Sequence, residues 1–155
     1  MDSFHQPVRE IMSHPARTVA PEMTLGDLLR LFSSDDFDAY PVVRGEKLVG
    51  IISRADSIKP FAGKTTNKTT DFDAITGTTV EQVMCSRVVT VELDATLEKV
   101  VDLMGAHDFE SFPVIDREGR VIGMIACDDV VRALARGASR PCLPRDLRPM
   151  GYAIA

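Results

Sequence analysis

The chain repeats one pattern of residues, and this duplication constrains its fold more than any other feature. In the first part of each copy, matching residues lie 72 positions apart, as Val8 and Val80 do. Further along, the offset becomes 73, as between Gly50 and Gly123, because one turn is a residue longer in the second copy. Folded units tolerate length changes in turns, so the pattern predicts a tandem pair of similar units about a pseudo-twofold axis, with ligand clefts between them. The matched segments are residues 8–12 with 80–84, Thr18-Val19 with Thr90-Val91, Tyr40-Pro41-Val42 with Phe112-Pro113-Val114, and 48–52 with 121–125.

Composition indicates a globular protein. The 155 residues are 45% hydrophobic and 26% charged, which is enough apolar material for a core. No apolar run approaches the roughly 18 residues of a membrane span, and the first residues lack the basic and apolar regions of a signal peptide. The three cysteines form no C-x-x-C pair, which indicates reduced thiols. We therefore expect a cytoplasmic protein with no membrane contact.

Charge and residue spacing restrict the partners. The net charge of −5 disfavours nucleic acid, and the histidines and cysteines lack metal-ligand spacing. The C-terminal tail, residues 137–155, contains Pro141, Pro144 and Pro149, which rule out a continuous helix. Its arginines are expected to be solvated, and the alternative is contact with an acidic partner or a phosphate.

Each copy has the residue pattern of a helical turn, an extended stretch, a helix, a β-hairpin and a closing helix. Apolar residues at i, i+3, i+4 and i+7 predict helices over residues 25–32 and 97–104. Thr24 and Thr96 are suitable N-caps, and Asp27 gives the first helix a sequence that resembles a capping box. The helical turns that contain Val8 and Val80 are expected to anchor each unit.

The two hairpins contain a proline in their first strands. Residues 39–43 with 48–52, and 111–115 with 121–125, are β-rich runs separated by turn residues. Pro41 and Pro113 lack an amide hydrogen, so their strands are expected at a sheet edge or interrupted at the proline.

The closing helices should run from Arg54 to about Phe61 and from Cys127 to about Arg136. The resulting domain boundaries are 8–61 for repeat 1, 62–78 for a threonine-rich linker and 79–136 for repeat 2.

This order of elements, with an aromatic-Pro-Val strand and Gly-Ile-Ile-Ser-Arg-Ala-Asp leading into a helix, resembles the cystathionine β-synthase (CBS) domain. Two such domains in tandem resemble a Bateman module, and the resemblance covers residues 8–61 and 79–136. It implies an α+β fold of two CBS-like βαββα repeats packed through their sheets. It also implies two clefts that hold adenosine-containing ligands such as AMP, ADP, ATP or S-adenosylmethionine, and a homodimer of modules.

The family's ribose and phosphate contacts centre on a Ser/Thr-x-x-Asp motif, which Ser53-Arg54-Ala55-Asp56 matches in full. A carboxylate can accept hydrogen bonds from both ribose hydroxyls, and a helix N-terminus with a hydroxyl and an arginine suits a phosphate. Ser-x-x-Asp before a helix is also a capping box, so pure capping is the alternative for Ser53 and Asp56.

The second copy has Ala126-Cys127-Asp128-Asp129 at the motif and keeps only the terminal carboxylate, Asp129. Ala126 cannot bond a phosphate and Asp128 adds a repelling charge, so the second site is predicted to be impaired. Tyr40 and Phe112 are either purine walls or core residues of half-buried strands. Residue matching gives the expected linings: Thr18, Val19, Tyr40 and Pro41 in the first cleft, and Thr90, Val91, Phe112 and Pro113 in the second.

The sequence offers no nucleophile and base at motif spacing, which disfavours an enzyme. We therefore predict a stand-alone regulatory module that senses an adenosine-containing nucleotide, requires no cofactor and transmits the signal to a protein partner. The alternative is a non-catalytic dimerisation scaffold whose clefts are empty or filled by side chains.

Overall fold

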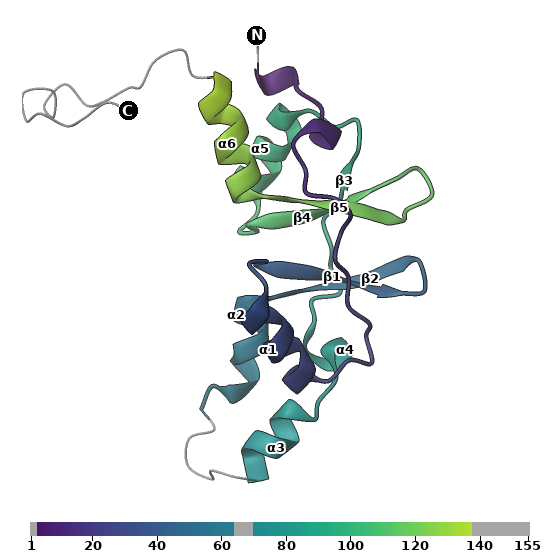
Figure 1. Cartoon of the computed structure of the whole chain (residues 1–155), viewed down its shortest axis with the longest axis vertical. Coiled ribbons are helices and arrows are strands. Elements are labelled where there is room, and N and C mark those ends of the chain that lie inside the picture. The colour runs from purple at the N-terminus through teal and green to yellow at the C-terminus, as the bar shows by residue number, and fades with distance from the viewer. Residues whose placement is uncertain (1–2, 64–69, 138–155) are drawn as a thin grey trace, which may run out of the picture.

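A computed structural model describes residues 3–63 and 70–137, and it contains two similar halves stacked along the long axis of the molecule (Figure 1). The two β-sheets face each other in the middle, and the helices cover their outer sides. The predicted α+β fold of two repeats packed through their sheets is confirmed. The first half contains α1 (Leu25–Ser34), β1 (Ala39–Arg44), β2 (Lys47–Ser53), α2 (Arg54–Ile58) and a 3-10 turn, Lys59–Phe61. The second contains β3 (Val91–Glu92), α5 (Leu97–Ala106), β4 (Ser111–Ile115), β5 (Val121–Ala126) and α6 (Cys127–Gly137).

Antiparallel hairpins form the centre of each half, as predicted. In the first hairpin Ala39 lies opposite Ser53, and in the second Ser111 lies opposite Ala126. Each ladder changes register once, after Val42 or after Val114. The two hairpins are therefore near copies in backbone geometry as well as in sequence.

The proline-containing strands differ in position, because β1 belongs to a two-stranded sheet and β4 is the central strand of a three-stranded one. β4 lies between β3 and β5, and β1 has Val19 bridged to its free side. The amide of Val19 donates to the Pro41 carbonyl at 3.1 Å, and the Val43 amide donates to the Val19 carbonyl at 3.0 Å. This parallel pairing uses the carbonyl of the proline and the amide two residues later, so it needs no N–H from Pro41. The edge prediction holds for β1 and is wrong for β4, where so short a parallel partner leaves the proline position unused.

Threonine caps begin both long helices. The Thr24 hydroxyl accepts a hydrogen bond from the Asp27 amide at 3.2 Å, and Thr96 accepts one from Lys99 at 3.4 Å. The predicted return bond from Asp27 does not form; its carboxylate binds Arg30 instead. The exposed arginine one turn later offers the Asp27 carboxylate a charged partner.

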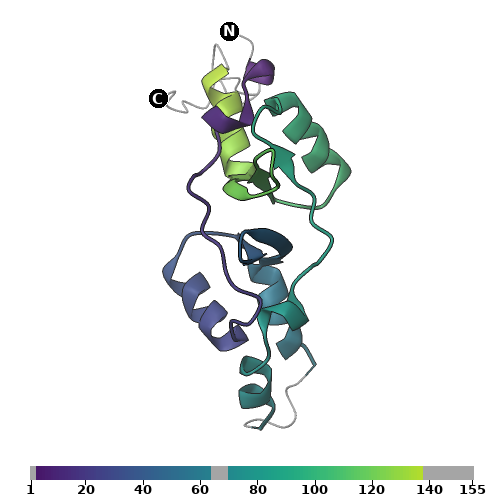
Figure 2. The same ribbon diagram turned by 90° about the vertical axis from the view of Figure 1, so that its right-hand side faces the viewer.

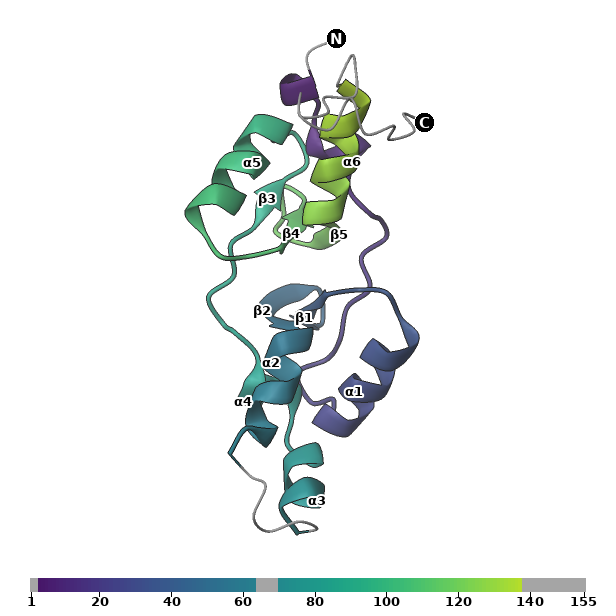
Figure 3. The same ribbon diagram turned by 90° about the vertical axis from the view of Figure 1, so that its left-hand side faces the viewer.

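The helical turns that open each repeat pack against the other repeat. The Val8 amide, in the 3-10 turn Val8–Glu10, donates to the Ala95 carbonyl at 2.8 Å. The Val80 amide, in α4 (Val80–Val83), donates to the Met23 carbonyl at the same distance. Figure 2 and Figure 3 show the two connecting segments running past each other on opposite sides of the molecule. The expectation that each turn anchors its own unit was wrong, because the two segments are exchanged between the repeats.

This exchange also defines the two cores. Each buried cluster contains residues from both copies of the pattern, and each centres on the outer face of one sheet. One cluster consists of Val8, Ile11, Val91, Leu97, Val100, Phe112, Val114, Ile125, Val130 and Ala133. The other consists of Val19, Leu25, Leu28, Phe32, Tyr40, Val42, Ile52 and Val80.

The predicted linker, residues 62–78, includes one helix that the sequence did not indicate, α3 (Thr70–Thr76). Residues 64–69 of the linker and 138–155 of the tail lie outside the described residues. No helix within the described ranges is long and apolar enough to cross a membrane.

Candidate functional site

The Ser53–Asp56 motif begins α2 and forms a complete capping box. The Ser53 hydroxyl accepts from the Asp56 amide at 3.1 Å, and Oδ2 of Asp56 accepts from the Ser53 amide at 3.1 Å. The other carboxylate oxygen of Asp56 accepts from Lys59 at 2.9 Å. The Asp56 side chain is 22% exposed and that of Lys59 is 73% exposed. One oxygen of Asp56 is therefore committed to the helix, while the other is held only by a surface lysine.

The electrostatics of Asp56 favour its ionised form. Partial burial by itself raises the pKa of Asp56, but hydrogen bonds from Lys59 and Ser53 outweigh burial and hold the pKa below its ordinary value. A charged carboxylate at this position can accept hydrogen bonds from a diol.

The second motif repeats this arrangement around its carboxylate. Oδ2 of Asp129 accepts from the Ala126 amide at 2.8 Å, and Oδ1 accepts from Arg132 at 2.9 Å. Arg132 stands at the position that matches Lys59. The difference between the motifs lies in the cap itself, since Ala126 has no hydroxyl.

Arg54 is engaged with the loop before β1. Its Nε donates to the Phe37 carbonyl at 2.8 Å, and a terminal nitrogen donates to the carbonyl of Asp35. The guanidinium carbon also lies 5.2 Å from the centroid of the Phe32 ring. Arg54 therefore holds the loop in place through two of the five N–H donors of its guanidinium.

Tyr40 is completely buried against α1, where its ring lies 4.7 Å from that of Phe32. Its hydroxyl donates to the Asp35 carboxylate at 2.8 Å, and Arg17 pairs with the same oxygen at 2.8 Å. Burial and the hydrogen bond to Asp35 raise the pKa of Tyr40 to about 12. The sequence indicated Tyr40 but gave no sign of the polar cluster that it forms with Asp35 and Arg17.

The remaining predicted lining residues lie along the parallel strand pairs. Val19 is buried and bonded to Pro41, whereas Thr18 is exposed. In the second half Val91 pairs with Val114 beside Pro113, and Thr90 is half-buried. The structure therefore places each predicted set close together at the start of a hairpin. Ligand contact by these residues stays a prediction.

A small pocket lies at the predicted second cleft. Its volume is only about 10 Å³, so it holds at most one water. Phe112 was predicted to line this cleft, but the other lining residues were not. They are Ile51 from the first repeat, Arg87, Val88, Val89, Phe109 and Ser111.

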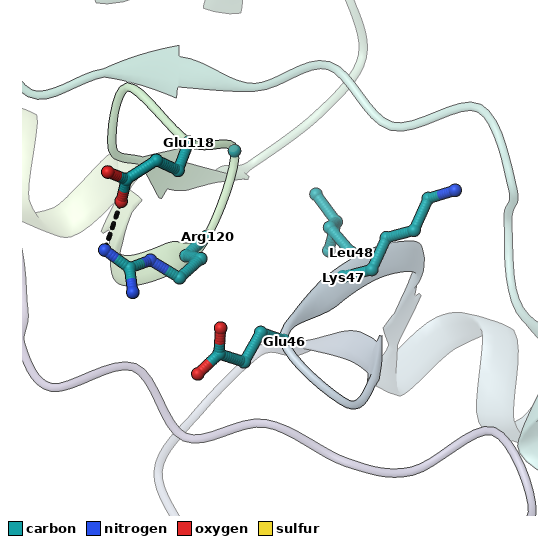
Figure 4. A pocket seen from close by; sticks show the side chains of 6 residues that line it. Glu46, Lys47, Leu48, Glu118 and Arg120 are labelled. Carbon is teal, nitrogen blue, oxygen red and sulfur yellow. Dashed lines mark hydrogen bonds and ion pairs between the residues drawn. The ribbon is translucent and has the colours of Figure 1, made fainter.

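The larger cavity, about 670 Å³, lies between the tips of the two hairpins and away from both motifs (Figure 4). Its charged lining is partly neutralised, because Arg120 pairs with Glu118 and with Asp116. The backbones of Lys47 and Arg120 form a β-bridge there. This space is an open gap between two turns, and no predicted site residue lines it.

The residues described offer little for metal or redox chemistry. No three His, Cys, Asp or Glu side chains gather as a metal site requires within residues 3–63 and 70–137. Cys85 and Cys127 are free thiols, and Cys142 lies outside the described residues.

Two repeats with exchanged first turns, and a carboxylate motif at the start of each closing helix, define a tandem-repeat α+β fold. The CBS domain pattern matches residues 8–56 and 80–136, more than half of the sequence, and the chain belongs to the CBS domain family.

Relatives include inosine-5′-monophosphate dehydrogenase of Methanocaldococcus jannaschii, 32% identical over 124 residues that cover 79% of this chain and 22% of the dehydrogenase. The chain spans less than half the length of the first curated relatives it matches, 24%, 22% and 43%. Among solved structures, protein MJ1225 of the same organism has a TM-score of 0.77 and 27% identity, covering 84% of this chain and 48% of that one. The CBS domain pair of protein MJ0100, in complex with 5′-methylthioadenosine and S-adenosyl-L-methionine, has a TM-score of 0.71 and 25% identity over 83% of this chain and 99% of that one.

Proposed function

We propose that this chain is a non-catalytic regulatory module that binds an adenosine-containing nucleotide between its two repeats. The observation that carries the proposal is the state of Asp56, whose second carboxylate oxygen has the exposed Lys59 as its sole partner among residues 3–63 and 70–137. Ribose hydroxyls can replace a surface lysine at small cost, because exposed ion pairs contribute at most about 1 kcal/mol. The adenosine derivatives bound to the CBS domain pair of MJ0100 support this ligand class.

The ligand acts by changing how the two halves pack. The halves are joined through facing sheets and through the exchanged turns, so a molecule wedged between them alters their relative tilt. A protein partner or a second copy of the module reads this change. AMP, ADP, ATP and S-adenosylmethionine are the candidate ligands, and no cofactor is required.

Thermal melts and calorimetry against these four compounds test the proposal. A ligand at a hundred times its dissociation constant should stabilise the fold by about 2.7 kcal/mol. Asp56→Ala should abolish the stabilisation. Asp27→Ala is the matched control, because Asp27 occupies the same helix position on α1 and its carboxylate pairs with the exposed Arg30.

Failure of all four compounds to shift the melting temperature at millimolar concentration would reject adenosine sensing. Equal loss of binding in the Asp56 and Asp27 variants would show that stability, rather than a ribose contact, is the cause. Mass spectrometry of small molecules retained by the purified protein provides an independent check.

A second candidate function is the dimerisation scaffold, and the near-closed pocket at the second cleft favours it. Exposed apolar residues stand at matching positions on the closing helices, with Ile58 61% exposed on α2 and Val131 57% exposed on α6. They fit a homodimer through α2 and α6. Sedimentation of Ile58→Asp, with the exposed α3 residue changed in Phe72→Asp as control, tests this interface. A wild-type dimer with no ligand response would favour the scaffold.

A further inference from the structure

Each hairpin has one serine and one alanine facing each other across its two strands, but the serine is on the second strand in one hairpin and on the first strand in the other. In the first hairpin Ala39 on β1 lies opposite Ser53 on β2, and in the second Ser111 on β4 lies opposite Ala126 on β5. Directly opposed side chains in an antiparallel pair lie about 5 Å apart. The second repeat therefore keeps a hydroxyl beside the start of its closing helix, although it has moved from one strand to the other.

The two repeats also differ in which segment carries an arginine near the motif. The first motif carries Arg54, which Cys127 replaces in the second, while the extended segment before β3 carries Arg87, where the first repeat has Pro15. Each repeat thus has one arginine near its motif, but on a different element. Their states differ, because Arg54 is bonded to two backbone carbonyls, whereas no carboxylate pairs with Arg87 in the part of the chain that the structure describes.

The relocated hydroxyl and the relocated arginine meet at one pocket. Ser111 and Arg87 both line the small pocket at the second cleft, with apolar walls from Val88, Val89 and Phe112. The Ser111 hydroxyl has no hydrogen-bond partner within residues 3–63 and 70–137. By contrast, the Ser53 hydroxyl is occupied by the amide of Asp56. The nearby carboxylate of Asp129 is paired with Arg132 at 2.9 Å, which reduces its repulsion of an anion.

We propose that Arg87 and Ser111 form an anion site in the second cleft that binds the phosphate of a phosphorylated ligand. The guanidinium binds phosphate oxygens in a bidentate manner and the serine hydroxyl donates to a third. The ligand gains room by displacing Phe109, whose ring is 40% exposed and packs edge-on against Phe112 at 6.2 Å. The identity of the organic part of this ligand rests on the proposed function, whereas the phosphate contact does not.

Titrations followed by amide NMR of the full chain test the anion site, with AMP, adenosine and ribose 5-phosphate as probes. AMP should bind about tenfold more tightly than adenosine and should shift the amides of residues 87–89 and 109–112. Arg87→Gln should remove this tenfold preference and leave adenosine affinity unchanged, and Ser111→Ala should reduce it severalfold. Arg117→Gln, an exposed arginine in the β4–β5 turn, is the matched control and should have no effect.

The outcomes separate the two proposals. If AMP binds and only Asp56→Ala weakens it, the anion site is rejected and adenosine sensing stands. If adenosine and AMP both fail to bind but ribose 5-phosphate shifts residues 87–89 in an Arg87-dependent manner, adenosine sensing is rejected and the anion site stands. If none of the three probes shifts these amides, the anion site is rejected. Circular dichroism of each variant shows whether a lost response reflects unfolding.

Discussion

The backbones of Ser13 and Met124 exchange both amide–carbonyl hydrogen bonds, each 2.9 Å long, and thereby attach the N-terminal segment to β5 of the other repeat. Cys85 and Ile51 exchange the same pair of bonds at 2.9 Å, which attaches the middle of the chain to β2. Each half therefore includes a segment that the sequence assigns to the other. The chain therefore crosses between the halves twice, once after Ser13 and once after Cys85.

Gly123→Ala should destabilise the protein by roughly 1–3 kcal/mol, measured by urea unfolding. A Cβ at this position would stand 2.7 Å from the Ser13 carbonyl oxygen and 2.8 Å from the Met12 sulfur, so the exchanged segment would have to move. Gly105→Ala in α5 is the control, because nothing lies within 4 Å of its Cβ position. It should stabilise the helix by roughly 0.5–1 kcal/mol. Equal effects of the two substitutions would contradict the close approach at Gly123.

Val8→Ala should loosen the second repeat rather than the first, although Val8 stands at the start of the first. Val8 is fully buried in the cluster that contains Val114 and Ile125, and the substitution should cost about 2 kcal/mol. Native-state hydrogen exchange should accelerate most at the amides of these two residues. Val80→Ala should instead accelerate exchange at Val42 and Ile52, which share its cluster. Faster exchange within the repeat that carries the substitution would refute the exchange of segments.

Tyr40→Phe should remove a stabilising contribution that depends on pH. The pKa of Tyr40 is raised from 10.0 to about 12 in the folded protein, so the protonated form is favoured by folding. The contribution is fully present below pH 10 and is lost as the pH rises to about 12. The stability difference between wild type and variant should therefore be about 1 kcal/mol at pH 8 and should shrink between pH 10 and 12. A difference that does not change over this interval would refute the buried hydrogen bond to Asp35.

Asp56→Ala should cost about 1 kcal/mol in the absence of ligand, because it removes the return bond of the capping box. The pKa of Asp56 is lowered, so its contribution is present above the ordinary carboxyl pKa and is lost as the pH falls through the folded value. The difference from wild type should therefore shrink on acidification. Asp27→Ala, which removes only an exposed ion pair with Arg30, should cost less than about 0.5 kcal/mol. Chemical denaturation at pH 7 and below pH 4 checks both variants.

The secondary structure was largely predictable because it depends on local patterns. Apolar spacing in α1 and α5, threonine caps and turn residues between β-rich runs each act within a few residues of the chain. The duplication strengthened these assignments, since each element could be compared with its copy. The missed helix α3 has large apolar residues only at Phe72 and Ile75, too few for a recognisable period.

The candidate site was predictable only in part. The motif at Ser53 and Asp56 could be recognised from spacing, and the same residues form the capping box in the structure. Ser111 could have been found by comparing the hairpins across their strands, because it faces the alanine that replaces the motif serine. Arg87 offered no such signal, because its place beside Ser111 depends on how the extended segment crosses between the halves.

The sequence by itself determined the fold, because the duplicated apolar and turn patterns allow few other arrangements of these elements. It also determined which side chains are available at each motif. Only the tertiary structure decided which segment completes which half, since the opening turns of the two copies have the same apolar face and either core could accept either turn. In the structure Gly50 packs against Met84 and Gly123 packs against Met12, and the crossing segment brings Arg87 to the second cleft.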